Sequence, residues 1–174
     1  MGALVRSTTV TALVAVAAPL DFDRLYRDAR DDVYAYAATL LRDRTAAEDV
    51  TAAAFERAYR RRDAFDERRG SPRAWLFGIV RHAALDELRR RKRVATLPDD
   101  PPESSEDMAE ATARRAAVRA ALARLSARDR ELIALRFYAG LSNSELASVV
   151  GVSATNAGTL VHRAMTKLRE AVDD

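Results

Sequence analysis

The sequence contains no cysteine and only two histidines among its 174 residues. A chain without cysteine can form neither a disulfide framework nor a thiolate zinc site, and two histidines are too few for a His-rich metal cluster. The sequence also has no glycine-rich phosphate loop and no nucleophile elbow. These absences argue against an enzyme, a metal site and a bound cofactor, and they fit a reducing cytoplasm.

No apolar run is long enough to cross a membrane. The apolar stretch near the start, Val10 to Ala18, is too short to span a bilayer. One arginine precedes it and it contains Ala-Val-Ala, so residues 1–20 resemble a weak signal peptide. Because the rest of the chain looks cytoplasmic, we expect a poorly ordered extension or a short docking helix, a cytoplasmic protein and no membrane insertion.

The net charge of +3 conceals an uneven distribution of charge. Setting Lys and Arg against Asp and Glu gives −3 for residues 1–56, +8 for 57–93, −6 for 94–113 and +4 for 114–174. Clustered arginine is typical of nucleic-acid-binding surfaces, although a charged run can equally be the solvated face of a helix. Charge alone leaves both interpretations open.

Apolar residues recur at helical spacing through residues 21–93. After a first stripe over residues 22–41, a second helix is expected to begin near Thr45, with Thr45 as the N-cap and Glu48 at the capping-box position. Ser-Pro at positions 71–72 then predicts a cap and a first helical residue for a third helix, which ends in the basic sequence RRRKR. The pattern predicts an all-α bundle.

Residues 94–112 are rich in Pro, Ser and acidic residues and poor in apolar ones. Such a segment cannot bury enough surface to offset its ordering entropy, so it is predicted to be a flexible acidic linker. Its charge would keep it off DNA, but solvation explains the composition equally well. Beyond it, Ser126 with Asp129 predicts the start of a further helix that Gly140 ends.

The C-terminal part, residues 113–174, is predicted to contain a helix-turn-helix unit. A capping box at Ser142 and Glu145 opens its first helix, and Gly151 supplies the tight turn. Ala147, at the fifth position of the unit, lets the two helices approach closely. The interior positions are apolar: Leu146, Val150, Val152, Ala157 and Leu160. An ordinary helical hairpin within a bundle would share part of this pattern.

Two motifs in this order, RAWLFGIVRHAALDELRRR (residues 73–91) and LSARDRELIALRFYAGLSNSELA (residues 125–147), resemble those of extracytoplasmic-function sigma factors. The resemblance covers about 150 residues of the chain. It implies two small helical domains, region 2 at residues 21–93 and region 4 at residues 113–174. It further implies a protein that binds core RNA polymerase, recognises the minus-ten and minus-thirty-five elements of promoter DNA and helps to open the duplex. Such proteins often have an anti-sigma factor as a partner.

The resemblance also implies site residues. Core-polymerase contacts are expected at Asp49 and Arg57. Minus-ten DNA contacts are expected at Arg81, His82, Asp86, Arg89, Arg90, Arg91, Lys92 and Arg93. Minus-thirty-five DNA contacts are expected at Arg136, Thr155, Asn156, Gly158, Thr159, His162 and Arg163.

The sequence departs from the family pattern at five of its positions. Ala52 and Ala53 stand where members commonly have a Gln-Glu pair on the polymerase-binding surface, and His82 stands where Asn is usual. Gly158 and Leu160 replace basic residues of the DNA-reading helix. We therefore expect a weaker attraction to phosphates at this helix and a backbone that can approach DNA at Gly158. Affinity for the promoter is then expected to come mainly from polymerase and from the first domain, to which the linker tethers this helix.

Within the DNA-reading helix, Asn156 and Thr159 are predicted to read base edges, while Arg163 and Arg136 hold phosphates. Two alternatives to a sigma factor remain: a stand-alone helix-turn-helix regulator, and an enzyme, against which the missing phosphate loop, nucleophile elbow and metal-ligand cluster argue. A stand-alone helix-turn-helix regulator would read a symmetric site as a dimer, and the arginine-rich first domain with its Trp75 motif argues against it. His82 and Asp86, one helical turn apart, could suggest a metal or acid–base pair, but no third ligand lies near in sequence.

Overall fold

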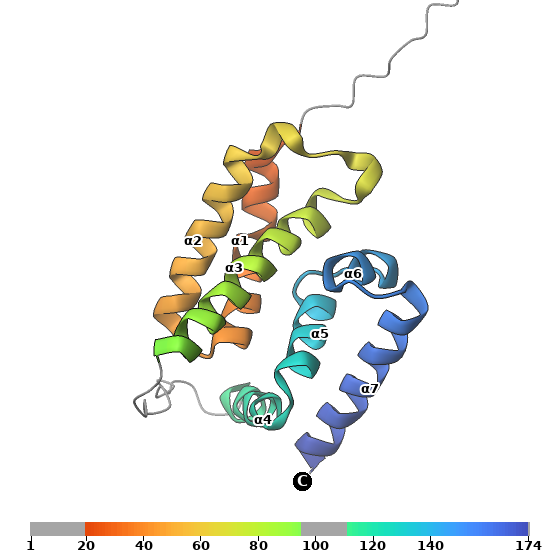
Figure 1. Ribbon diagram of the computed structural model, residues 1–174. Coiled ribbons are helices and arrows are strands. Elements are labelled where there is room, and N and C mark those ends of the chain that lie inside the picture. The colour runs from red at the N-terminus through yellow and green to blue at the C-terminus, as the bar shows by residue number, and fades with distance from the viewer. Residues whose placement is uncertain (1–19, 95–110, 174) are drawn as a thin grey trace, which may run out of the picture.

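The computed structural model describes residues 20–94 and 111–173, and all regular elements in these ranges are helical, as predicted. The N-terminal half contains α1 (Phe22–Leu41), α2 (Arg44–Arg60), the short 3-10 turns η1 (Arg62–Ala64) and η2 (Glu67–Arg69), and α3 (Pro72–Val94). The C-terminal half contains α4 (Ala111–Arg124), α5 (Ala127–Phe137), α6 (Asn143–Val150) and α7 (Ala154–Asp173), as Figure 1 shows. Most of the predicted extension and linker lies outside the described residues.

The first three helices form a bundle in which each helix contacts the other two. Their facing sides are apolar: Val33, Tyr36 and Ala37 of α1 and Leu76, Phe77 and Val80 of α3 are completely buried. Edge-to-face aromatic contacts reinforce the packing, with 5.6 Å between the ring centres of Tyr36 and Phe77. Figure 1 shows α1, α2 and α3 running side by side.

The predicted cap of the second helix was wrong. The helix begins at Arg44, and its N-cap is Asp43, whose carboxylate accepts a hydrogen bond from the backbone N–H of Ala46 at 2.9 Å. A carboxylate is both a hydrogen-bond acceptor and a negative charge at the positive end of the helix, so it outcompetes a hydroxyl two residues later. Glu48 instead pairs with Arg44 at 3.2 Å.

The remaining helix starts agree with the sequence signals. The hydroxyl of Ser71 accepts a hydrogen bond from the N–H of Ala74 at the start of α3. Ser126 caps α5 in the same way. Ser142 and Glu145 form both halves of a capping box at α6, and Gly151 ends α6 in the left-handed conformation at φ 76°. These signals involve residues no more than four positions apart, which is why sequence alone reveals them.

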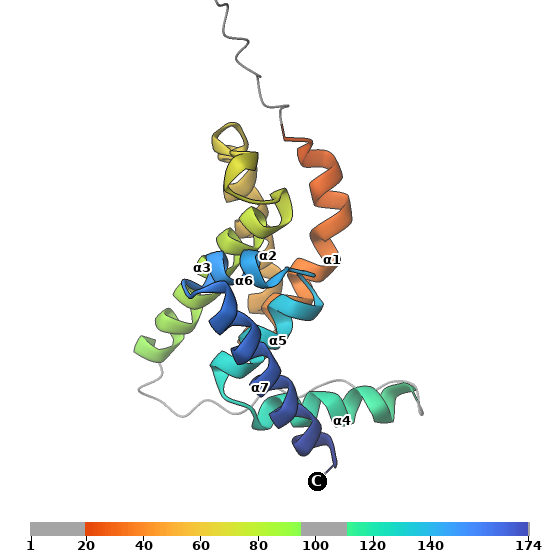
Figure 2. The same cartoon turned by 90° about the vertical axis from the view of Figure 1, so that its right-hand side faces the viewer.

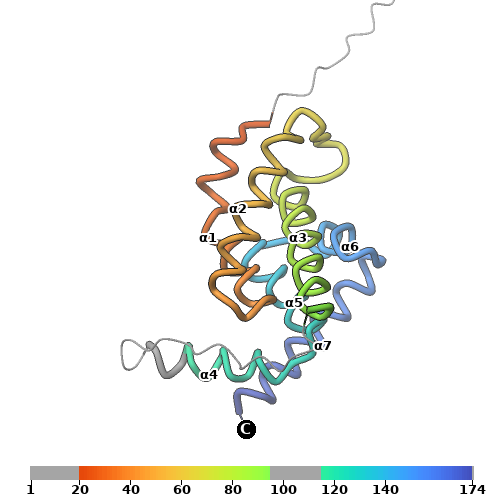
Figure 3. Tube along the Cα trace, turned by 60° about the vertical axis from the view of Figure 1, so that its left-hand side comes forward, coloured from red at the N-terminus to blue at the C-terminus, as the bar shows by residue number. Residues whose placement is uncertain are grey.

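The two halves of the chain pack against each other. α1 contacts α5, and α3 contacts α6. One continuous buried cluster includes residues of both halves, among them Leu76 and Val80 from α3 and Leu132, Leu135 and Leu146 from α5 and α6. Figures 2 and 3 show α6 lying beside α3 and α5 close to α1. Although the sequence predicts two small domains, their cores are joined in this arrangement.

Candidate polymerase- and DNA-binding surfaces

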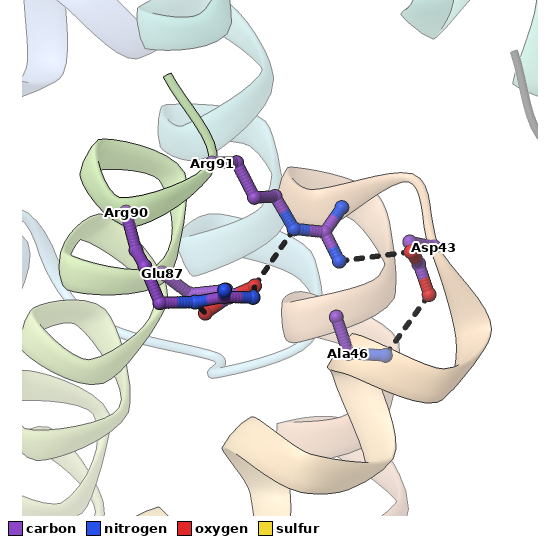
Figure 4. A network of polar contacts seen from close by, with 5 residues as sticks. All are labelled: Asp43, Ala46, Glu87, Arg90 and Arg91. Carbon is purple, nitrogen blue, oxygen red and sulfur yellow. Dashed lines mark hydrogen bonds and ion pairs between the residues drawn. The ribbon is translucent and has the colours of Figure 1, made fainter. Parts of the chain in front are cut away.

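The basic end of α3 is tied to the start of α2 by a network of carboxylates and guanidinium groups. Glu87 accepts hydrogen bonds from Arg90 at 2.7 and 2.8 Å and from Arg91 at 2.8 Å. Arg91 also donates to Asp43, the N-cap of α2, at 2.8 Å. Figure 4 shows how Arg91 bridges Glu87 and Asp43, so that this arginine has a structural role as well as its predicted contact with DNA.

This network shifts the acid–base behaviour of its members. Hydrogen bonds from Arg90 and then Arg91 lower the pKa of Glu87 from 4.5 to about 2. The hydrogen bond from the Ala46 N–H is the main cause that lowers the pKa of Asp43. In turn, Glu87 raises the pKa values of Arg90 and Arg91. All of these groups are therefore charged near neutral pH.

Apart from Arg81, the other predicted minus-ten residues lie along the exposed side of α3. Arg89 pairs with Asp86 at 2.9 Å, and both side chains are exposed. His82 is exposed, and its Nδ1 lies 2.7 Å from the carbonyl oxygen of Gly78. Since a carbonyl can only accept, Nδ1 donates its proton in this contact. Lys92 and Arg93 are exposed at the end of the helix.

A cavity of about 610 Å³ lies beside His82 and Asp86. Its wall includes the half-buried Trp75 of α3, which packs against Phe65 with 5.6 Å between ring centres. Arginines of α2 and the η turns also line the cavity, as do Ser148 and Val149 of α6. The cavity combines an aromatic wall and cationic groups with more than enough room for one base, and stacking surface and positive charge are the features that bind a single-stranded base.

Arg81 is placed differently from the prediction. Its Nε donates to Oε1 of Glu131 on α5 at 2.6 Å, and the two side chains are only 20% and 10% exposed. Glu131 is a buried charged residue of the core. In this arrangement Arg81 therefore joins the two halves of the chain and does not lie on an open surface for DNA.

The predicted polymerase contacts lie on the outer face of α2. Asp49, Ala53 and Arg57 follow one another at intervals of four residues and are all exposed, as is Ala52. Ala52 borders a shallow groove of about 570 Å³ between α1 and α2, which Tyr26, Tyr34 and Phe55 also line. The groove offers aromatic surface next to Ala52, so a partner can bind here through apolar area.

The predicted DNA-reading surface of α7 is open. Thr155, Asn156, Thr159, His162 and Arg163 are all exposed, while Ala157, Val161 and Ala164 are buried on the opposite side. Leu160 is half-buried against the shared core, in keeping with its predicted interior position. Arg136, at the end of α5, is exposed and donates to the carbonyl oxygen of Leu141 at 2.7 Å.

Gly158 faces α6. A Cβ atom at this position would lie 3.0 Å from the side-chain nitrogen of Asn143, the first residue of α6. The missing side chain thus makes room for the neighbouring helix of the helix-turn-helix unit. This packing explains why a glycine stands at position 158. The predicted contact of Gly158 with DNA stays a prediction.

Sequence reasoning missed the residues that join the two halves. Arg73 donates to the backbone oxygens of Tyr138 and Ala139, both at 2.6 Å, and pairs with Asp32 of α1. Ser71 donates to Glu145. The partners lie between 41 and 74 positions apart, so no local spacing signals them. Only the position of Arg73 at the start of the first motif, with Ser71 two residues before it, could have drawn attention to them.

In residues 20–94 and 111–173, no group of three or more His, Cys, Asp or Glu side chains could hold a metal ion. Nor is any helix of these ranges both long enough and apolar enough to cross a membrane.

Comparison with known proteins decides the family. The model of Sigma-70 region 2 matches residues 25–94, and that of Sigma-70, region 4 matches residues 115–168. The chain is 31% identical over 150 residues to the ECF RNA polymerase sigma factor SigL of Mycobacterium tuberculosis, covering 83% of this chain and 85% of SigL. The protein is an ECF sigma factor. It therefore binds core RNA polymerase and directs promoter-specific transcription initiation.

Other sigma factors are similar over comparable lengths. SigM of Bacillus subtilis is 26% identical over 155 residues, which cover 86% of this chain and 94% of SigM. Among solved structures, the sigma factor RpoE of Bartonella quintana, in complex with the anti-sigma factor NepR, shares the fold with a TM-score of 0.77 at 24% identity, over 88% of this chain and 97% of that one. CnrH, in complex with the cytosolic domain of CnrY, gives a TM-score of 0.63 at 27% identity, over 87% of each chain.

The family matches assign the helices of this sigma factor to regions. The region 2 match spans most of α1 and all of α2 and α3, while the region 4 match begins within α4 and ends within α7. The helix-turn-helix of α6 and α7 therefore belongs to region 4. The surfaces described on α2 and α3 belong to region 2.

Proposed function

We propose that this sigma factor uses three separate surfaces. The exposed face of α2 with Asp49 and Arg57 binds core polymerase, the exposed side of α3 with the adjoining cavity binds the opened minus-ten strand, and the outer face of α7 binds the minus-thirty-five duplex. In this proposal, region 2 consists of residues 21–93 and region 4 of residues 113–174. The protein works by binding and not by catalysis, in the cytoplasm together with its polymerase.

One observation carries this assignment. The side chains proposed for the three contacts cluster by element, and all of those on α2 and α7 are exposed. Arg57 lines the same cavity as His82, so the polymerase-binding and minus-ten surfaces adjoin. Such adjacency suits a protein that must hold a melted strand against the polymerase.

We also include an anti-sigma factor among the partners. Two of the structurally similar proteins are described in complex with NepR and CnrY respectively. The aromatic groove between α1 and α2 and the cavity between α3 and α6 offer surfaces that such a partner can cover.

A variant series at His82 tests the minus-ten assignment. His82→Ala should reduce the formation of open promoter complexes by core polymerase about tenfold while closed complexes persist, because a flipped base contacts the protein only after melting. His82→Asn should retain activity and shift the preferred base. Arg24→Ala, on the exposed start of α1, serves as the control. Equal losses of closed and open complexes in His82→Ala would contradict the assignment and indicate a folding role.

A further inference from the structure

Three arginines line the cavity beside His82, and none of them is paired with a carboxylate. They are Arg57 of α2, Arg61 directly after α2 and Arg69 of η2. Arg57 and Arg61 are four residues apart, so they project from the same side of the chain. Within residues 20–94 and 111–173, none of the three guanidinium groups forms an ion pair or a side-chain hydrogen bond.

The neighbouring arginines, in contrast, are paired. Arg60 forms an ion pair with Glu56 at 2.6 Å, and Arg68 forms one with Asp66 at 2.9 Å. Neither Arg60 nor Arg68 lines the cavity. The arginines that gather around the cavity are thus the ones whose hydrogen-bond donors are available to an anionic ligand.

The two carboxylates of the lining do not neutralise these arginines. Asp66 accepts two hydrogen bonds from Arg68, both at 2.9 Å, and Asp86 accepts one from Arg89 at 2.9 Å. The hydrogen bonds from Arg68 are the main cause that lowers the pKa of Asp66, and the charge of Arg69 contributes least. Each carboxylate is therefore compensated by an arginine outside the lining, and the cavity keeps an excess of positive charge.

An aromatic surface adjoins the arginines. Trp75, the single tryptophan of the chain, and Phe65 both line the cavity and are half-buried, so part of each residue is accessible. Ile79 adds apolar area, and the exposed His82 can form hydrogen bonds with the edge of a base. A planar heterocycle can stack on such rings, because every base has a π-face.

Size and charge together indicate the class of ligand. The volume of about 610 Å³ falls in the range of about 300–1,000 Å³ that is typical of small-molecule sites. A phosphodiester within a strand carries one negative charge, whereas a terminal phosphate carries about 1.5 to 2 at pH 7 and the inner phosphate of a diphosphate adds another. A nucleoside diphosphate therefore concentrates more charge beside one base than a nucleotide of a strand does, which suits three arginines next to one aromatic surface.

We propose that the cavity binds a free nucleoside diphosphate, with the base against Trp75 and Phe65 and the phosphates on Arg57, Arg61 and Arg69. Binding itself is independent of the three surfaces proposed above. One consequence rests on the proposed function: because the cavity is also assigned to the minus-ten strand, the nucleotide and the strand compete for it. The bound nucleotide thus lowers the amount of open complex.

The fluorescence of Trp75 measures binding directly, because no other tryptophan contributes to the emission. The full chain is titrated with GDP and with ADP, under excitation that the bases do not absorb. At least one of the two nucleotides should quench the emission to saturation. The matching nucleoside, which lacks phosphates, should bind roughly tenfold more weakly, and inorganic pyrophosphate, which lacks a base, should displace the nucleotide only at roughly tenfold higher concentration.

Two results of this titration would overturn the proposal. One is the failure of both GDP and ADP to quench Trp75. The other is pyrophosphate that binds as tightly as the nucleotide, which would reduce the cavity to a simple anion site.

Two single substitutions test the phosphate contacts. Arg61→Gln and Arg69→Gln each remove one charge from the lining and should weaken nucleotide binding roughly tenfold, with little change in nucleoside binding. Arg60→Gln is the matched control, since Arg60 neighbours Arg61 but pairs with Glu56 outside the cavity. All three arginines are exposed, so the fold should tolerate their loss, which circular dichroism checks. Parent-like nucleotide affinity in both Arg61→Gln and Arg69→Gln would contradict the proposal.

A comparison with a strand separates the two sources of a base with phosphate. A short single-stranded deoxyoligonucleotide without terminal phosphates should displace the nucleotide only at roughly tenfold higher concentration in the absence of polymerase, because each of its phosphodiesters brings one charge. An oligonucleotide that binds more tightly than both GDP and ADP would show that the cavity serves the promoter strand alone and would refute a nucleotide site.

The functional arm uses the full chain with core polymerase and a promoter that the parent chain transcribes. At about ten times its Kd, the nucleotide should raise the sigma-factor concentration for half-maximal open-complex formation roughly tenfold, and Arg61→Gln should be much less sensitive. Equal sensitivity of the parent chain and Arg61→Gln would assign the effect to polymerase and refute the competition. Failure of the parent chain to transcribe any promoter, with quenching of Trp75 intact, would instead refute the proposed function, so the two failures are distinguishable.

Discussion

At the scale of single residues, Asp43 connects local and tertiary structure. Arg42 adopts the left-handed conformation at φ 54° and ends α1, and the next residue caps α2 and receives Arg91 from the end of α3. One carboxylate thus fixes a helix start and the position of the basic segment. Its neighbour Glu87 is held between two guanidinium groups.

Substitution at Asp43 should separate its two contributions. Asp43→Ala removes the cap and the contact with Arg91 and should lower the free energy of unfolding by about 1–2 kcal/mol. Asp43→Asn keeps a good capping side chain and loses only the charge, so it should cost clearly less. Urea denaturation of both variants measures the difference, and equal losses would show that the ion pair, and not the cap, provides the stability.

The Glu87 network predicts a pH dependence of stability. The pKa of Glu87 is about 2 in the folded protein, compared with 4.5 when the side chain has no partners, as in the unfolded chain. Because the folded-state pKa is lowered, the network stabilises the fold at pH values above the pKa of the unfolded state. This contribution is lost as the pH falls from about 4.5 to 2. Glu87→Gln should therefore be less stable than the parent chain at pH 7, and the gap should shrink toward pH 3. Denaturation curves across this range provide the test, with the exposed Glu170→Gln as control; a gap independent of pH would contradict the account.

At the scale of elements, the sequence predicts helix boundaries best where the signal is local. The capping box at α6 and the glycine after it lie within one helix, and both are found as expected. At α2, the sequence pattern predicts Thr45 as the cap, but the carboxylate of Asp43 caps the helix instead. At α7, the pattern correctly places Asn156 and Thr159 on the exposed side.

The basic end of α3 should contribute unequally to DNA binding. Arg90 and Arg91 are already paired with carboxylates, whereas Lys92 and Arg93 are exposed at the helix end. Lys92→Gln/Arg93→Gln should reduce the salt slope of promoter-complex formation by a little under two units, since each phosphate contact contributes about 0.9. Arg90→Gln/Arg91→Gln should change the slope less and destabilise the fold more. Titration of complex formation against salt concentration distinguishes the two double variants. An unchanged salt slope in Lys92→Gln/Arg93→Gln would show that Lys92 and Arg93 only solvate the helix.

The reading face of α7 should depend on Asn156 for specificity. Asn156→Ala should relax the preference at one or two base pairs of the minus-thirty-five element, at a cost of about 1–3 kcal/mol on the preferred sequence. Arg163→Gln, the matched phosphate variant, should weaken binding on all sequences and lower the salt slope. Binding of holoenzyme to a library of minus-thirty-five sequences gives both readouts. Uniform weakening by Asn156→Ala would mean that it does not read bases.

At the scale of the whole molecule, the sequence predicts the parts but not their assembly. The all-α fold and the helix-turn-helix follow from periodicity and caps, which are properties of neighbouring residues. The joined core, Arg73 and the pair of Arg81 with Glu131 depend on contacts between residues far apart in the chain. A buried guanidinium looks the same in sequence as one that contacts DNA, so the sequence does not reveal that Arg81 pairs with Glu131.

The central claim is that one chain, with two joined regions, directs polymerase to promoters with two elements. Run-off transcription with core polymerase on a genomic promoter library tests it most directly. We expect discrete start sites that depend on this protein, each preceded by two sequence blocks at a fixed spacing near minus ten and minus thirty-five. Start sites with no second block, a single symmetric site, or no transcription above that of core polymerase alone would contradict it.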